Sequence, residues 1–331
     1  MASFPWLNIA SGALFGSALT AAGMYSPSTI IGQMHLTNFH MMKGFLAASA
    51  SSALAIIFAR SLNLSPCKPR TPNTLSLLGT YDGNIIGGLL LGFGMALTGA
   101  CPGTVFPQLA TGISSAIPVV GGTILGGIIY SKLKPHINSK VTNQEALSKP
   151  TVYQKLGLSE KTAITFYELA LTAGLLGASI YAPRNSASLV NPVLGGLLVG
   201  GTQFASLYLT GSTLGISTAF EQIGDFFWWA VHSLSGSKAP MPNIRGTAFA
   251  FGTLGGSFLL GRIVAIPTPD EHIEAKDDIV PQGDKVNSCH CFVEFDDATK
   301  ADLAIEALDG TDKWGGEIAV RRAHPTKRKA I

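Results

Sequence analysis

Apolar residues fall into long stretches along this chain, each close to the length that a helix needs to cross a bilayer. The hydrocarbon core of a membrane is about 30 Å thick, which corresponds to about 20 helical residues. Short polar connections separate the stretches. We predict eight membrane spans, near 6–24, 40–62, 83–101, 115–133, 162–182, 191–211, 216–232 and 243–265.

The stretch 216–232 fits a span less well than the other seven. Glu221 and Asp225 stand beside an aromatic run at 226–229. Such a pattern also suits a helix that lies at the membrane interface or faces a pore. Both interpretations stay open for this stretch.

Composition places the chain among membrane proteins. Of its 331 residues, 47% are hydrophobic and 13% are charged, and the mean hydropathy is +0.33. These values leave too little polar surface for a soluble protein of this length. Residues 1–59 contain Lys43 as their one basic residue and no Asp or Glu. The sequence therefore predicts an all-α polytopic protein in a lipid bilayer, inserted without a cleavable signal peptide.

Basic residues gather in two connections, and their position predicts orientation. Nine of the fourteen basic residues before Pro267 lie between the second and third spans or between the fourth and fifth. The positive-inside rule makes that side cytoplasmic. Eight spans then place both termini in the cytoplasm.

A glycine-rich pattern recurs along the chain and predicts an internal repeat. Residues 12–27 read GALFGSALTAAGMYSP and residues 88–103 read GLLLGFGMALTGACPG, with glycines at matching offsets. A looser third copy at 196–215 inserts four residues before its Leu-Thr-Gly. Counting spans places the third copy in the membrane in the opposite orientation to the first two, which predicts two halves related by inverted pseudo-symmetry. For most of these glycines, close helix packing is the alternative interpretation.

Each copy ends in residues that interrupt a helix inside apolar sequence. Lipid cannot satisfy the freed backbone groups, so such a break must be buried in protein or line a cavity. The short segments after the first two breaks, about 28–34 and 104–113, predict re-entrant half-helices, whose N-termini favour an anion. We expect a constriction lined by Gly23, Met24, Tyr25, Ser26, Pro27, Gly99, Cys101, Pro102, Gly103, Thr104, Gly211, Ser212 and Thr213.

The segment 99–104, Gly-Ala-Cys-Pro-Gly-Thr, follows Gly-Leu-Leu-Leu-Gly-Phe-Gly at 88–94. Together they resemble the YeeE/YedE family of sulfur-transport membrane proteins, over most of residues 6–265. The resemblance implies uptake of thiosulfate across the plasma membrane, through an hourglass-shaped protein whose narrow pathway is lined by cysteines on broken helices. Whether a cytoplasmic sulfur-carrier protein is a partner stays open.

The match to the family's cysteines is partial. Cys101 corresponds to a family cysteine, but the first copy has Met24-Tyr25 at that place and the third has Ser212-Thr213. A relay of several thiols is therefore not available. A neutral thiol still suits a soft sulfur anion as a weak donor. A transporter or channel for a different small solute is the alternative.

The other ionisable residues and the cysteines give weaker indications of a functional site. Glu168 has the best claim among the intramembrane charges to face the protein interior, with a pairing to Arg245 or Arg262 left open. We interpret both arginines and Lys43 as snorkelling toward a helix end. The four cysteines lack metal-binding spacing and no nucleophile–base set is present, so the sequence indicates no metal, cofactor or enzymatic activity.

The composition turns polar after the transmembrane transport domain, which we place at 1–266. Residues 267–287 form a charged linker, and 288–331 a small partial α+β tail. The tail resembles the second half of an RNA-recognition motif, at 291–295 and 304–310. Half of a four-stranded sheet cannot bury a core, so we expect no RNA binding by the tail alone. A membrane-anchored RNA-binding scaffold is the lesser alternative.

Overall fold

The computed structural model describes most of the chain in two compact units, Met1–Glu271 and His272–Ile331. In the second unit it describes one antiparallel pair of two-residue strands, β1 (Asp312–Lys313) and β2 (Gly316–Glu317). The predicted linker, and the tail strands and helix that we expected, lie outside the described residues. These residues are 5–64, 82–138, 152–182, 188–235, 240–267, 312–313 and 316–317.

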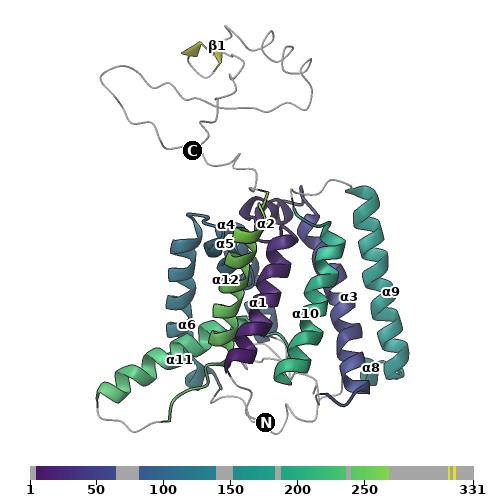
Figure 1. The fold of residues 1–331 in the computed structure, drawn as a ribbon. Helices are drawn as coiled ribbons and strands as arrows, with labels where there is room; N and C mark the ends of the chain where they lie inside the picture. Colours follow the sequence, from purple (N-terminus) through teal and green to yellow (C-terminus); the bar gives the residue numbers. More distant parts are fainter. Residues whose placement is uncertain are drawn as a thin grey trace. The chain divides into compact units, whose positions relative to one another are not determined.

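A helix stands at each of the eight predicted stretches of the first unit (Figure 1). Four of them, α3, α6, α9 and α10, are long and apolar enough to cross a membrane, which supports an integral membrane protein. Three shorter helices are α2 (Pro27–Met34), α5 (Val105–Ala110) and α8 (Val152–Lys155). The long helices are α1 (Pro5–Ala21), α3 (His40–Ser61), α4 (Asp82–Thr98), α6 (Ala116–Asn138), α9 (Glu160–Tyr181), α10 (Pro192–Thr210), α11 (Ser217–Leu234) and α12 (Arg245–Ile263).

Helices α1 and α12 form a tightly packed parallel pair. A Cβ atom on Gly12 would overlap the carbonyl oxygen of Phe249, and one on Gly256 would overlap that of Ala13. Gly16 and Gly252 meet backbone of the opposite helix in the same way. Small residues one turn apart therefore let the two backbones approach, as in other membrane helix pairs. For these glycines the packing interpretation is confirmed.

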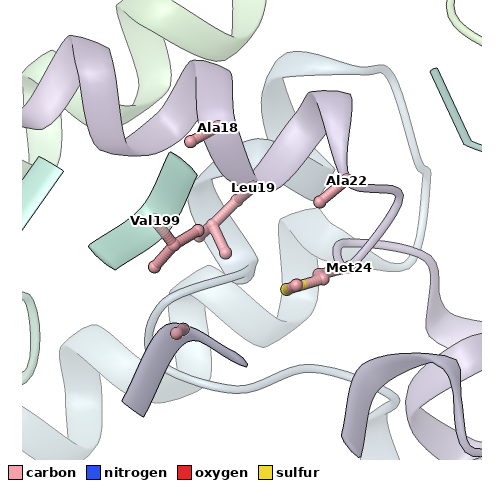
Figure 2. Packing of buried hydrophobic residues seen from close by; sticks show 6 residues of the cluster. Ala18, Leu19, Ala22, Met24 and Val199 are labelled. Carbon is pink, nitrogen blue, oxygen red and sulfur yellow. The ribbon is translucent and has the colours of Figure 1, made fainter. Parts of the chain in front are cut away.

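Helix α10 lies antiparallel to α1 on another of its sides. Ala18 and Leu19 of α1, with Ala22 just after its end, pack with Val199 of α10 and with Met24 in one buried cluster (Figure 2). Helix α3 runs parallel to α10 on its far side, and α9 packs outside α3. Burial is therefore concentrated in α1, α3, α10 and α12.

The helix directions give seven alternating helices, not eight. We call the end of the first unit at which α1 begins its lower end and the opposite one its upper end (Figure 1). Helix α10 descends beside α1 and α12 ascends beside it, so the chain between them returns to the lower end. Helix α11 therefore does not carry the chain from one end of the unit to the other, which fits the alternative to a span that stays open for 216–232.

Polar contacts explain why α11 stays at the lower end. Its carboxylates bond to α6, Glu221 to Lys134 and Asp225 to the hydroxyl of Ser131. The side chain of Gln222 accepts a hydrogen bond of 2.8 Å from the backbone N–H of Gly246, at the start of α12. The start of α1 and the end of α12 therefore lie at opposite ends of the unit, whereas eight alternating spans would bring them to the same end.

The three predicted breaks coincide with helix ends. Gly23, Gly99 and Gly211 each follow the end of a long helix with a φ of +67°, +60° and +67°. Glycine adopts this left-handed conformation without the Cβ penalty that other residues meet. The short helices α2 and α5 follow the first two breaks, whereas the longer α11 follows the third. Inverted pseudo-symmetry between the copies stays an interpretation.

Candidate functional site

The first two breaks lie against each other at the upper end. A Cβ atom on Gly99 would come within 2.9 Å of the Cβ of Pro27 and 3.2 Å of the Cδ1 of Ile31. Gln108 of α5 joins the breaks from below, because its amide nitrogen donates to the carbonyl oxygens of Tyr25, at 2.8 Å, and Gly99, at 2.7 Å. Its side chain is buried. One amide group therefore ties the two breaks together.

His40 satisfies another carbonyl freed by the first break. Its Nε2 lies 2.7 Å from the carbonyl oxygen of Ala22, and the residue is fully buried at the start of α3. A neutral imidazole with its proton on Nε2 donates this bond. The carbonyls of Ala22, Tyr25 and Gly99 are thus all paired with buried side chains.

Sequence reasoning missed both Gln108 and His40. Their partners lie 83 and 18 residues away in sequence, so no local pattern indicates these bonds. One signal was available for Gln108, since it is a polar residue inside an apolar segment too short to span. A polar residue there needs a partner, which makes it a candidate for holding a break.

Cys101 stands in a turn held by its neighbour Thr104. The Thr104 Oγ1 accepts a hydrogen bond of 2.9 Å from the backbone N–H of Cys101 and lies 3.3 Å from the Cys101 Sγ. The thiol is free and partly buried. A Cβ on the adjacent Gly103 would lie 3.9 and 4.0 Å from the side chains of Phe15 and Leu19. The segment with Cys101 therefore faces α1.

Met24 takes part in packing at the position where the second copy has Cys101. It is buried, as are Tyr25 and Ser26, and its Sδ and terminal methyl group lie against Gly44 of α3. Its thioether has no proton to donate, unlike a thiol. The first break therefore presents a different chemistry from the second.

The third break lies at the other end of α10 from the first two. Gly195 of α10 packs against Ala22, and Gly211 follows sixteen residues later, which corresponds to about 24 Å of helix. Ser212 and Thr213 are exposed. The chain then turns back, because the N–H of Leu214 donates to the Oε1 of Gln203 at 3.3 Å. The structure thus brings together two of the three predicted segments.

The intramembrane charges differ from expectation. Lys43 is buried rather than snorkelling, and its Nζ donates to the carbonyl oxygen of Ala182. Arg245 and Arg262 are exposed. Glu168 is partly buried, and its Oε1 atom is buried without a hydrogen-bond partner. Ion pairs among the described residues join Arg60 to Glu160 and Lys134 to Glu221, so neither arginine of α12 pairs with Glu168.

Comparison with known proteins addresses the family directly. A search of curated proteins finds no match. The protein family described as Sulphur transport matches residues 21–265. That match covers most of the chain and includes all three breaks as well as the packed helices around them. The chain therefore belongs to the sulphur transport family.

Proposed function

We propose that the protein takes up a small sulfur-containing anion, such as thiosulfate, through a constriction formed by its broken helices. Family membership supports sulfur transport, and the apolar helices support a place in the membrane. The observation that carries the proposal is the pair of breaks joined by Gln108, with the free thiol of Cys101 beside it. We propose that 23–27 and 99–104 line this constriction, and that 211–213 line the pathway at the other end of α10.

The two joined breaks are held by specific side-chain contacts and are not frayed helix ends. Frayed ends expose carbonyl groups to solvent, whereas Gln108 and His40 are buried and bond to specific carbonyls of the breaks. Unpaired backbone groups at membrane depth would each cost several kcal/mol, roughly. A protein that holds two breaks in this way fixes the position of the chain between them, including the Cys101 thiol.

Helix α2 adds a weak attraction for an anion. It begins at Pro27, and its N-cap residue Ser26 makes no side-chain cap hydrogen bond. The N-terminus of a helix carries partial positive charge. This charge lies beside Gly99 at the start of the Cys101 segment. An anion is therefore favoured over a cation there.

A single thiol defines the proposed sulfur chemistry. The Cys101 S–H is a weak, polarizable donor, which suits the soft terminal sulfur of thiosulfate without holding it tightly. No bond to the substrate is formed or broken in this step. Tyr25 contributes a hydroxyl group at the first break, and Ser212 and Thr213 contribute hydroxyl groups at the other end of α10, where further thiols are lacking. Transport then depends on one thiol contact rather than on a relay.

A different small anion is the second candidate substrate. The hydroxyl groups of Ser212 and Thr213 favour it, because hydroxyl donors suit oxygen atoms better than sulfur atoms. The same constriction would then select by size and charge. Competition between thiosulfate and an all-oxygen anion of similar size separates the two candidates.

Growth of a sulfate-uptake-deficient host on thiosulfate as the sole sulfur source tests the proposal. We expect growth with the intact protein and with Thr123→Val, which removes an intrahelical hydroxyl contact on α6. We expect loss of growth with Cys101→Ala present in the membrane at the same amount. Absence of growth with intact, inserted protein would exclude thiosulfate, and undiminished growth with Cys101→Ala would exclude the thiol contact.

A further inference from the structure

We propose that Asn8, Ser11 and Gln203 form a second binding position for a small oxyanion, nearer the lower end than Cys101. The inference rests on the proposed function, because it extends the same pathway toward the lower end. It concerns three polar side chains that no motif identifies. Two are on α1 and one is on α10.

All three side chains are buried and have polar atoms without a partner. Asn8, Ser11 and Gln203 are 7%, 0% and 6% exposed. Within the part of the chain that the structure describes, the Asn8 Nδ2, the Ser11 Oγ and the Gln203 Nε2 make no hydrogen bond. Leaving one such group unpaired costs about 1–3 kcal/mol. Asn8 and Ser11 lie about one turn apart on α1, and α10, which contacts α1, carries Gln203, so a solute between the helices can supply the missing acceptors.

The unpaired amide groups of Asn8 and Gln203 support a binding position more strongly than the hydroxyl group of Ser11 does. Thr20 and Ser257 also bury unpartnered hydroxyl groups. A hydroxyl on a helix can rotate to bond the carbonyl four residues earlier, so its isolation is easily relieved. Gln203 has no such freedom, since its Oε1 is already held by the N–H of Leu214. Its Nε2 must therefore donate elsewhere.

Helix α1 connects the proposed position to the Cys101 segment. Asn8, Ser11, Phe15 and Leu19 follow one another at steps of three and four residues, so they share one side of the helix. Phe15 and Leu19 are the side chains that face Gly103. From Leu19 to Ser11 is eight residues, or about 12 Å along the helix. The side of α1 that meets the Cys101 segment thus continues down to Ser11 and Asn8.

The register of α10 places Gln203 in the same half of the unit. Ala22 packs against Gly195 and Ala18 against Val199, and the helices are antiparallel. One turn beyond Val199, Gln203 therefore comes opposite the middle of α1, between Leu19 and Ser11. The returning third break reaches the same turn through Leu214.

The unpartnered atoms are donors, which identifies the class of ligand. Two amide N–H₂ groups and one hydroxyl can bind the oxygen atoms of a small oxyanion without adding a charge that would trap it. Helices α1, α10 and α12 contain no Asp or Glu that would repel an anion. Neutral donors suit release of an anion as well as binding.

Labelling of an introduced thiol tests access to the position without requiring transport. The probes are an anionic sulfonatoethyl and a cationic trimethylammonioethyl methanethiosulfonate, applied to Ser11→Cys and read by peptide mass spectrometry. The matched control is Thr20→Cys, nine residues on and so on the opposite side of α1, with an equally buried hydroxyl. We expect Ser11→Cys to react about tenfold faster than the control, and faster with the anionic probe.

Uptake kinetics test the donors themselves. Gln203→Glu keeps an oxygen for the N–H of Leu214 but replaces the Nε2 donor with a carboxylate oxygen, and Asn8→Asp is the parallel change. For each we expect a KM for thiosulfate raised by about tenfold or more, since a lost donor to an anion is worth at least that factor. Thr253→Val on α12, whose hydroxyl already bonds the carbonyl of Phe249, should leave KM unchanged.

The two tests fail in distinguishable ways. Any of three results would overturn the second position: no labelling of Ser11→Cys, equal labelling by both probes, or an unchanged KM in both acidic variants. Each can occur in a protein that still takes up thiosulfate, so the proposed function would not fail with it. Preferential anionic labelling in a protein that takes up no thiosulfate would support the position and reject the proposed substrate.

Discussion

The amide nitrogen of Gln108 donates to carbonyl oxygens of two different breaks, Tyr25 and Gly99. His40 adds a bond to Ala22, one turn from Tyr25. The side chains that pair the carbonyl groups of the breaks therefore lie outside the glycine motif. The motif supplies chain breaks, and buried side chains from α3 and α5 fix their geometry.

Replacing Gln108 should destabilise the protein measurably. Gln108→Met keeps the length of the side chain but leaves two buried carbonyl groups unpaired, which we expect to lower the unfolding free energy by about 2–4 kcal/mol. Thermal unfolding in detergent measures the change. Thr111→Val on the segment after α5, which removes only local contacts to 107 and 108, serves as control. Equal melting temperatures for both variants would contradict the bridging role.

At the scale of elements, close backbone packing holds α1 against α12. Gly256 and Gly255 are neighbours in α12, but a Cβ on the first would overlap the carbonyl oxygen of Ala13, whereas one on the second meets nothing within 4 Å. This contrast separates packing from the general effect of glycine on a helix.

Gly256→Ala and Gly255→Ala should therefore act in opposite directions. We expect the first to destabilise by about 1–3 kcal/mol because it forces the helices apart. We expect the second to be neutral or stabilising by up to about 1 kcal/mol, because alanine is the better helix former. Unfolding of both variants in detergent is the measurement. A similar response from the pair would mean that α1 and α12 do not pack as described.

Local sequence predicted the elements well and their long-range contacts poorly. The positions of the eight long helices follow from apolar stretches, and the three breaks follow from Gly, Pro and Ser, because these are local signals. For α11 the sequence left two interpretations open, since hydropathy cannot tell a crossing helix from one held across α6 by Glu221 and Asp225. Gln108 was missed for the same reason, as its partners are distant in sequence.

At the scale of the whole molecule, seven alternating helices change the predicted orientation. Helices α3 and α6 end, and α4 and α9 begin, at the lower end, and the sequence at 60–70 and 132–161 holds nine of the fourteen basic residues before Pro267. By the positive-inside rule we predict that the lower end is cytoplasmic and that the end of α12 faces the other side of the membrane.

Epitope tags placed at the two ends of the first unit test this orientation. In intact cells, an antibody should reach a tag inserted after Pro267 but not a tag before Met1, and permeabilised cells should show both. Seven crossings require this difference. Equal protection of both tags would restore the even number of crossings that hydropathy suggested.

Uptake of radiolabelled thiosulfate into vesicles that contain the purified protein tests the central claim most directly. We predict accumulation above that of protein-free vesicles, lost in Cys101→Ala and kept in Thr123→Val. Uptake no greater than in protein-free vesicles, with correctly inserted protein, would contradict the account.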